Sequence, residues 1–133
     1  MILTNGIDII DIRRIQKTID RFGNRFKKKC FSQNEIFRSE KITKSTESYA
    51  KRYAAKEACA KALGTGLARG VFWKDIEIYN DKYGKPKIRL HKNALKIYNK
   101  INNNSEFSIE VSLSDEVNYA IANVIIYENK KSK

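Results

Sequence analysis

The stretch SYAKRYAAKEACAKALGTG, which runs from Ser48 to Gly66, decides how this chain folds. It is rich in alanine and has no proline and no glycine before its end, so it predicts a helix from about Tyr49 to Leu63. Gly64 stands where a left-handed residue commonly ends a helix. We therefore expect about four helical turns, with Glu57 and Lys61 one turn apart on the same side.

Glu57 is the unusual residue of this helix, because it falls on the stripe of small residues that a helix normally buries. Lys51, Arg52 and Lys56 are expected to project elsewhere. A buried carboxylate costs several kcal/mol unless it is paired or holds a cation. Glu57 therefore either forms a surface ion pair with Lys61, contributing about 0.2–0.5 kcal/mol, or belongs to a site that holds a cation.

The composition predicts a single domain spanning residues 1–133, with a basic, flexible tail at about 128–133. The hydrophobic content of 41% is dispersed, and the sequence contains neither an apolar run of membrane-spanning length nor a signal peptide, so we expect no membrane partner and a cytoplasmic location. Cys30 and Cys59 lack metal-ligand spacing and are predicted to be free.

The net charge of +12, from 27 basic and 15 acidic residues, predicts an anionic partner. Nucleic acid, an acidic protein and a phosphorylated small molecule all satisfy that charge. Charge alone does not choose between them.

Near the amino terminus, Met1 to Ile10 has the bulky apolar residues of a strand, and Asp8 lies inside it. Asp is disfavoured within strands, so Asp8 either caps a nearby turn or needs a cation or hydrogen-bond donors. Together, Asp8 and Glu57 are two carboxylates in apolar surroundings.

A basic face follows this strand. Asp11 is placed as the N-cap of a helix from Ile12 to Phe22, whose exposed side carries arginines and lysines. Arg25 and the run Lys27 to Lys29 extend it into the densest basic patch of the chain. This patch is either a solvated face or a docking surface for an acidic partner.

The remaining elements predict a compact α+β single domain with a mainly antiparallel sheet packed against helices. The lone His91 is expected to have a surface or capping role. The predicted elements are a short helix from the capping box Ser32–Glu35 to Glu40, strands at 73–79 and 86–90 joined by a hairpin loop, a helix at 92–101, a polar loop at 102–105, and a hairpin of strands 107–113 and 119–127.

Four segments in this order, GIDI (6–9), RYAAKEA (52–58), KALGTG (61–66) and GKP (84–86), closely resemble the holo-[acyl-carrier-protein] synthases. These are the small phosphopantetheinyl transferases of fatty-acid synthesis, and the resemblance covers essentially the whole chain. It implies the 4'-phosphopantetheinyl transferase fold. It also implies transfer of the 4'-phosphopantetheine arm of coenzyme A to a serine of apo acyl carrier protein, with release of adenosine 3',5'-bisphosphate, by a homotrimer whose sites lie between subunits.

The same resemblance assigns roles to residues. Asp8 and Glu57 would hold Mg2+, and Lys61 would stabilise the departing bisphosphate, which makes these three the implied catalytic residues. A set that includes Lys61 would bind coenzyme A, and a second set would dock the acidic carrier protein. The coenzyme A set is Arg52, Lys61, Gly64, Gly84, Lys85 and Pro86, and the docking set is Arg14, Arg21, Phe22 and Arg25.

The chain departs from some relatives at Asp115, where they carry a histidine. A histidine base is therefore untenable here, and water, a carboxylate or Asp115 is left to accept the serine proton. The rival prediction is a basic nucleic-acid-binding module, but the aromatic, zinc-ligand and loop motifs of such modules are missing from the sequence. An inactive carrier-binding scaffold is disfavoured because Asp8, Glu57 and Lys61 occur together.

Overall fold

The computed structural model describes residues 2–102 and 106–129, so most of the predicted polar loop at 102–105 and the end of the basic tail lie outside the described residues. The elements, in chain order, are β1 (Ile2–Asp11), α1 (Ile12–Phe22), α2 (Asn24–Cys30), α3 (Gln33–Glu40), α4 (Ser45–Leu63), a 3-10 turn (Trp73–Asp75), β2 (Ile76–Asn80), β3 (Pro86–Leu90), α5 (Lys92–Asn102), β4 (Phe107–Glu116) and β5 (Tyr119–Glu128).

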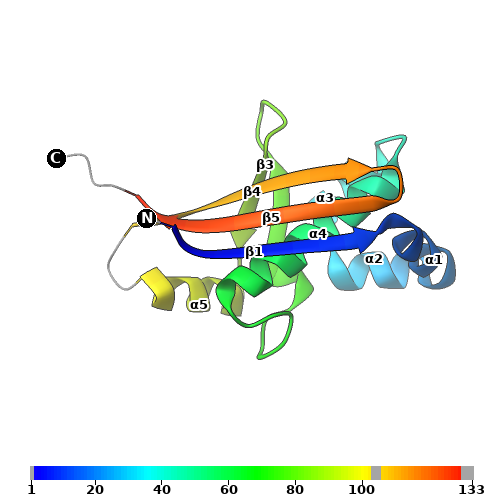
Figure 1. Cartoon of the computed structure of the whole chain (residues 1–133). Helices are drawn as coiled ribbons and strands as arrows, with labels where there is room; N and C mark the ends of the chain where they lie inside the picture. Colours follow the sequence, from blue (N-terminus) through cyan, green and yellow to red (C-terminus); the bar gives the residue numbers. More distant parts are fainter. Residues whose placement is uncertain (1, 103–105, 130–133) are drawn as a thin grey trace.

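The strands form two antiparallel sheets around α4, which confirms the predicted α+β class. The larger sheet has the order β1-β5-β4, and the smaller pairs β2 with β3. Figure 1 shows the helices on one face of the three-stranded sheet, with α4 directly behind it. Among the described residues, no helix combines the length and apolar character that crossing a membrane requires.

Several local predictions are confirmed. The side chain of Asp11 caps α1 by accepting from the backbone N–H of Arg13, and Ser32 and Glu35 form the capping box of α3. Gly64 ends α4 in the left-handed conformation, with φ of 84°. These features depend on contacts within a few residues of chain, which is why the sequence reveals them.

Four elements differ from the predictions by more than one residue; one of them is β4, which was predicted to end at 113 and continues to Glu116. Helix α2 was not predicted; Gly23, with φ of 54°, separates it from α1, and the burial of Cys30 anchors a short segment rich in lysine. Helix α4 begins at Ser45 rather than near Tyr49. The segment predicted as a strand from 73 begins with a 3-10 turn, because Asp75 accepts a hydrogen bond from the backbone N–H of Phe72.

Helix α4 is buried on most of its circumference, since one side packs on the three-stranded sheet and another meets β2 and α3. Its alanines allow this close contact; Ala50, Ala54, Ala55 and Ala58 are fully buried. Cys30 and Cys59 are free and buried in the same core, as predicted.

Candidate functional site

The approach of β1 to α4 builds the first part of the site. A Cβ atom added to Gly6 would lie 1.9 Å from the carbonyl oxygen of Ala58 and 2.8 Å from the backbone nitrogen of Ala62. Thr4, on the same side of β1, donates from its hydroxyl to the carbonyl oxygen of Ala62 at 3.0 Å. Because side chains alternate along a strand, Asp8 faces α4 together with Gly6.

This packing brings the three predicted catalytic residues together. The Lys61 ammonium lies 3.1 Å from Oδ1 of Asp8 and donates to the carbonyl oxygen of Ile7 at 2.9 Å. Within the described residues, Lys61 therefore pairs with Asp8, and the surface pair with Glu57, one of the two alternatives for that residue, does not form. Asp8 lies inside β1 and pairs with the Lys61 ammonium, so it does not cap a turn.

Glu57 has a raised pKa, as carboxyl groups in binding and catalytic sites often have. Partial burial raises the pKa of the Glu57 carboxyl, the negative charge of Asp8 raises it further, and Lys61 opposes both effects. A carboxylate in these surroundings is stabilised in its charged form by a bound cation.

A hard cation fits Asp8 and Glu57 only if other oxygen ligands complete its shell. Among the described residues there is no group of three or more His, Cys, Asp or Glu side chains that could hold a metal ion. Mg2+ is commonly bound through one or two carboxylates plus waters and substrate phosphates. The donor set therefore suits a metal that arrives with, or is completed by, a phosphorylated substrate.

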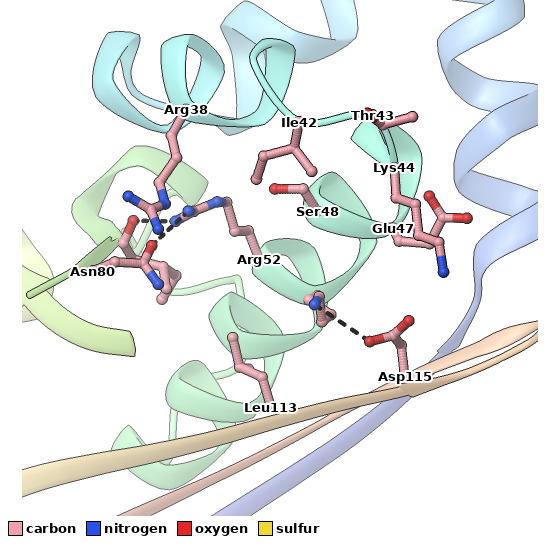
Figure 2. Close-up of a pocket in the computed structure, with 12 residues that line it drawn as sticks. Arg38, Ile42, Thr43, Lys44, Glu47, Ser48, Arg52, Asn80, Leu113 and Asp115 are labelled. Carbon is pink, nitrogen blue, oxygen red and sulfur yellow. Dashed lines mark hydrogen bonds and ion pairs between the residues drawn. The ribbon is translucent and has the colours of Figure 1, made fainter. Parts of the chain in front are cut away.

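A separate pocket of about 480 Å3 lies beside the first half of α4 (Figure 2). It lies between α3, the start of α4, the end of β2 and the β4 residues Leu113 and Asp115. The Lys51 ammonium and Oδ1 of Asp115 form an ion pair at 3.3 Å. Four basic side chains and two acidic ones line the pocket, so it favours an anionic ligand; they are Arg38, Lys44, Lys51 and Arg52 with Glu47 and Asp115.

Arg52 lies at one wall of this pocket and is only 5% exposed, a burial that its expected direction away from the Glu57 stripe did not reveal. Its guanidinium donates to the carbonyl oxygen of Ile78 and, at 2.8 Å, to Oδ1 of Asn80. Burial lowers the Arg52 pKa. Its Nε has no hydrogen-bond partner within the described part of the chain. On this side α4 packs against the β2–β3 sheet, which covers Arg52; on an isolated helix the same side chain would be exposed.

The predicted hairpin tip adjoins the pocket through Asn80. Gly84 has φ of 86°, a conformation that favours glycine, and its backbone N–H donates to the carbonyl oxygen of Asp81. The Lys85 ammonium lies 3.1 Å from Oε2 of Glu110 on β4. Pro86 begins β3, where its missing N–H does no harm to the pairing.

The predicted coenzyme A residues thus fall into two groups. Lys61, with Gly64 at the end of its helix, belongs with Asp8 at the β1 edge of the sheet. Arg52 and the Gly84–Pro86 turn belong with the pocket, whose Asp115 stands on β4. Strand β5 lies between β1 and β4, so one chain does not bring the two groups into one cleft.

The predicted docking residues share one surface on α1 and α2. Arg14, Arg21 and Arg25 are exposed, and Phe22 is 44% exposed. The Arg21 guanidinium lies 5.0 Å from the ring centre of Phe22. A hollow of about 260 Å3 is lined there by Thr18, Phe22, Arg25, Phe26 and Lys29.

The structure contains a buried ion pair between Lys56 and Glu35 that was not predicted from the sequence. The Lys56 ammonium lies 2.8 Å from Oε1 of Glu35, with both side chains fully buried. Lys56 was expected to project away from the stripe that carries Glu57, and that direction did not reveal its burial, because α3 and a second sheet pack on this side of α4. The capping box pointed to Glu35, but a partner 21 residues away leaves no local signal.

His91 lies just before α5, near the position predicted for it. Its Nε2 is 3.2 Å from Oε1 of the buried Glu77, a contact that its isolation in the sequence did not suggest.

Residues 5–122 match the model of the 4'-phosphopantetheinyl transferase superfamily. A holo-[acyl-carrier-protein] synthase of Phenylobacterium zucineum is 48% identical over 127 residues, which cover 95% of this chain and 92% of that one. The crystal structure of the Neisseria meningitidis holo-[acyl-carrier-protein] synthase superposes with a TM-score of 0.82 at 32% identity, covering 96% of this chain and 99% of that chain. The Helicobacter pylori enzyme, solved in complex with coenzyme A, gives a TM-score of 0.79 at 34% identity, covering 92% of this chain and 99% of the other.

By its fold and by this family match, the chain is therefore a phosphopantetheinyl transferase. Within that superfamily, the chain belongs to the holo-[acyl-carrier-protein] synthases.

Proposed function

We propose that this enzyme transfers 4'-phosphopantetheine from coenzyme A to a serine of apo acyl carrier protein, with Mg2+ as cofactor, and releases adenosine 3',5'-bisphosphate in fatty-acid synthesis. The observation that carries the proposal is the meeting of Asp8, Glu57 and Lys61 where β1 packs on α4. Family membership supports the reaction class, and the Helicobacter pylori relative in complex with coenzyme A supports the donor.

Asp8 and Glu57 are the residues that would hold the metal. When bound, Mg2+ neutralises charge on the transferring phosphoryl group and helps to align it with the attacking and leaving oxygens. Lys61 is already held beside Asp8, so its ammonium can turn toward a phosphate oxygen and stabilise the departing bisphosphate.

The nucleophile is the serine of the carrier protein. Asp115 is a poor candidate for the base within a single chain, because it pairs with Lys51 at the β4 edge while Asp8 lies on β1. A water or another carboxylate is left to accept the serine proton.

The basic pocket beside α4 suits the nucleotide end of coenzyme A. Arg38, Lys44 and Arg52 supply positive charge for phosphate groups. The Gly84–Pro86 turn, joined to the pocket through Asn80, would contact the adenine side of the nucleotide.

The exposed surface of α1 and α2 suits the acidic carrier protein. Arg14, Arg21 and Arg25 would meet its carboxylates, and Phe22 would supply an apolar contact. Charges of this kind act mainly on association rate and salt dependence.

We further propose that the enzyme is a homotrimer. The face of the large sheet turned away from α4 carries Ile7, Ile9 and Ile121, which are 59%, 61% and 40% exposed. Ile9 and Ile121 are cross-strand neighbours, so they form one apolar patch rather than scattered residues. Copies that meet on this face would also bring the β1 edge of one subunit toward the β4 edge of another, and so complete a site that one chain leaves divided.

We place the enzyme in the cytoplasm. The two free, buried cysteines suit a reducing compartment.

The test is to mix the purified chain with apo acyl carrier protein, coenzyme A and Mg2+ and to follow the mass of the carrier. We expect a gain of one phosphopantetheine arm that EDTA abolishes and added Mg2+ restores. A folded enzyme that modifies no carrier protein with any divalent metal would contradict the proposal, and transfer unaffected by EDTA would contradict its metal requirement.

A further inference from the structure

Side chains, rather than another strand, bind one edge of strand β2. Within residues 2–102 and 106–129 it pairs with β3 on one side only, and on the other side charged side chains of α3 and α4 take the place of a neighbouring strand. Lys56 donates to the carbonyl oxygen of Ile76, and Arg52, one turn earlier on α4, donates to that of Ile78. The backbone N–H of Ile78 in turn donates to Oε2 of Glu35. Helix α4 therefore holds the β2–β3 hairpin by side-chain hydrogen bonds.

Asn80, the last residue of β2, extends this attachment to the hairpin tip. Its Oδ1 accepts from the Arg52 guanidinium at 2.8 Å, and its Nδ2 donates to the carbonyl oxygen of Gly84 at 3.0 Å. A guanidinium can only donate and a carbonyl can only accept, so this orientation of the Asn80 amide is the one that satisfies both partners. Figure 2 shows Asn80 and Arg52 facing each other at the wall of the pocket.

The other hydrogen bonds of the turn are internal to it, and the ion pair of Lys85 with Glu110 ties it to β4 rather than to α4. Oδ1 of Asp81 accepts from the backbone N–H groups of Tyr83 and Lys85, and the carbonyl oxygen of Asp81 accepts from that of Gly84. These contacts give the turn its shape. Among the described residues, the direct link from the turn to α4 runs from Arg52 through Asn80 to Gly84.

We propose that Asn80 is a positioning residue for coenzyme A: it connects the buried Arg52 of α4 to the carbonyl of Gly84 and so sets the Gly84–Pro86 turn against the basic pocket. This rests on the proposed function, which assigns that turn to the nucleotide. Asn80 does not act on the reacting phosphoryl group. Its loss should weaken the binding of coenzyme A and leave the chemical step intact.

The experiment compares Asn80→Ala and Asn80→Asp with wild type. Alanine removes both bonds, whereas aspartate keeps the acceptor for Arg52 but replaces the donor to Gly84 with a second acceptor, so both variants release the turn. The matched control is Asn93→Ala, because the Asn93 side chain also donates to a glycine carbonyl, that of Gly70, at 2.9 Å, away from the pocket.

Three measurements are made on each full-length protein: the Kd for coenzyme A by calorimetry, the KM values and kcat for transfer, and hydrogen exchange of peptides that cover residues 81–86. For both Asn80 variants we expect a Kd and a KM for coenzyme A that rise about fivefold, as the loss of the one hydrogen bond that both changes remove, the bond to Gly84, predicts. The KM for the carrier protein and kcat at saturating coenzyme A should stay unchanged, and exchange at 81–86 should be faster. Asn93→Ala should bind coenzyme A as wild type does.

The positioning role is overturned if Asn80→Ala binds coenzyme A as tightly as wild type. It is also overturned if Asn93→Ala weakens binding to the same extent, since the effect would then be general loosening. A wild-type enzyme that neither binds coenzyme A nor modifies a carrier would instead overturn the proposed function, and the wild-type measurement alone reveals that outcome.

Discussion

The Lys61 ammonium lies 3.1 Å from Oδ1 of Asp8, while Glu57, one turn before Lys61 on α4, has no ion pair among the residues that the structure describes. Two carboxylates and one ammonium thus share the contact between β1 and α4. One of the carboxylates has no cation paired with it, and its pKa is raised. This arrangement suits a site that gains a cation with its substrate.

Replacing Glu57 with glutamine should therefore remove metal binding without unfolding the protein. The two side chains have nearly the same shape, and the change removes one unpaired, partly buried charge. We expect kcat to fall by about 10² or more, as for other lost transition-state electrostatics. The measurement is turnover against Mg2+ concentration, with Glu116→Gln, an exposed change at the end of β4, as control. Turnover near wild type with an unchanged Mg2+ dependence would remove Glu57 from the site.

Replacing Gly6 with alanine should disrupt the packing that assembles the site. The new Cβ would collide with the main chain of α4 at Ala58, and backbone cannot move aside as a flexible side chain can. We expect a loss of about 3 kcal/mol or more, at or above the usual range for overpacking, and lower activity in whatever fraction stays folded. Urea unfolding measures the loss.

The control for this change is Gly66→Ala, whose Cβ would meet nothing within 4 Å. Its cost is limited to left-handed backbone strain, about 1–2 kcal/mol. Equal losses in the two variants would show that close packing at Gly6 is not what matters.

The acid stability of the protein should depend on Asp11. Hydrogen bonds from Arg13 lower the pKa of this carboxyl from 3.8 to about 2. Because the folded pKa lies below the unfolded one, its stabilising contribution is present above pH 3.8 and is lost as the pH falls toward 2. In Asp11→Asn the amide oxygen still caps α1, but this acid-dependent loss should disappear. Urea unfolding of both proteins at a series of pH values tests it, and parallel curves would contradict the assignment.

Reversing two charges on the basic face should weaken use of the carrier protein. In Arg14→Glu/Arg21→Glu, the docking surface would repel acidic side chains, so the KM for the carrier should rise at least tenfold at low salt, as a loss of about 1.4 kcal/mol or more in electrostatic complementarity implies. The affinity for coenzyme A should not change. The control, Lys96→Glu/Lys100→Glu on the exposed side of α5, makes the same change in net charge elsewhere. An unchanged KM for the carrier would refute the docking surface.

Placing a charge on the outer face of the large sheet should separate the subunits. Ile9→Lys puts an ammonium in the apolar patch beside Ile121. We expect light scattering to report a trimer for wild type and a monomer for the variant, with activity lost because the site is divided. Leu95→Lys, which changes an exposed leucine of α5, should remain trimeric. A wild-type monomer with full activity would sink this proposal.

Much of the fold could be predicted from local patterns. The N-cap Asp11, the capping box of Ser32 and Glu35, and the final Gly64 all act within about one helical turn, so neighbouring residues are enough to identify them. The alternation of Phe107, Ile109 and Val111 predicted β4 for the same reason. The short helix α2 was not predicted, because its helical state depends on the burial of Cys30 and not on a strong local sequence signal.

The site was predicted only in part. Motif resemblance named Asp8, Glu57 and Lys61, and the tertiary structure brings them together. Which charges are buried could not be read from the helix alone: Arg52 and Lys56 were expected only to project away from the Glu57 stripe, yet a second sheet and α3 bury them.

The sequence by itself determined where most elements begin and end and which residues resemble a transferase, because capping, turn formation and side-chain periodicity are interactions between near neighbours. Only the tertiary structure decided that Lys61 pairs with Asp8, that Lys56 pairs with Glu35, and that Asn80 joins Arg52 to Gly84. Pairings between residues distant in the chain depend on which surfaces pack together, and that packing sets both burial and the strength of each charge.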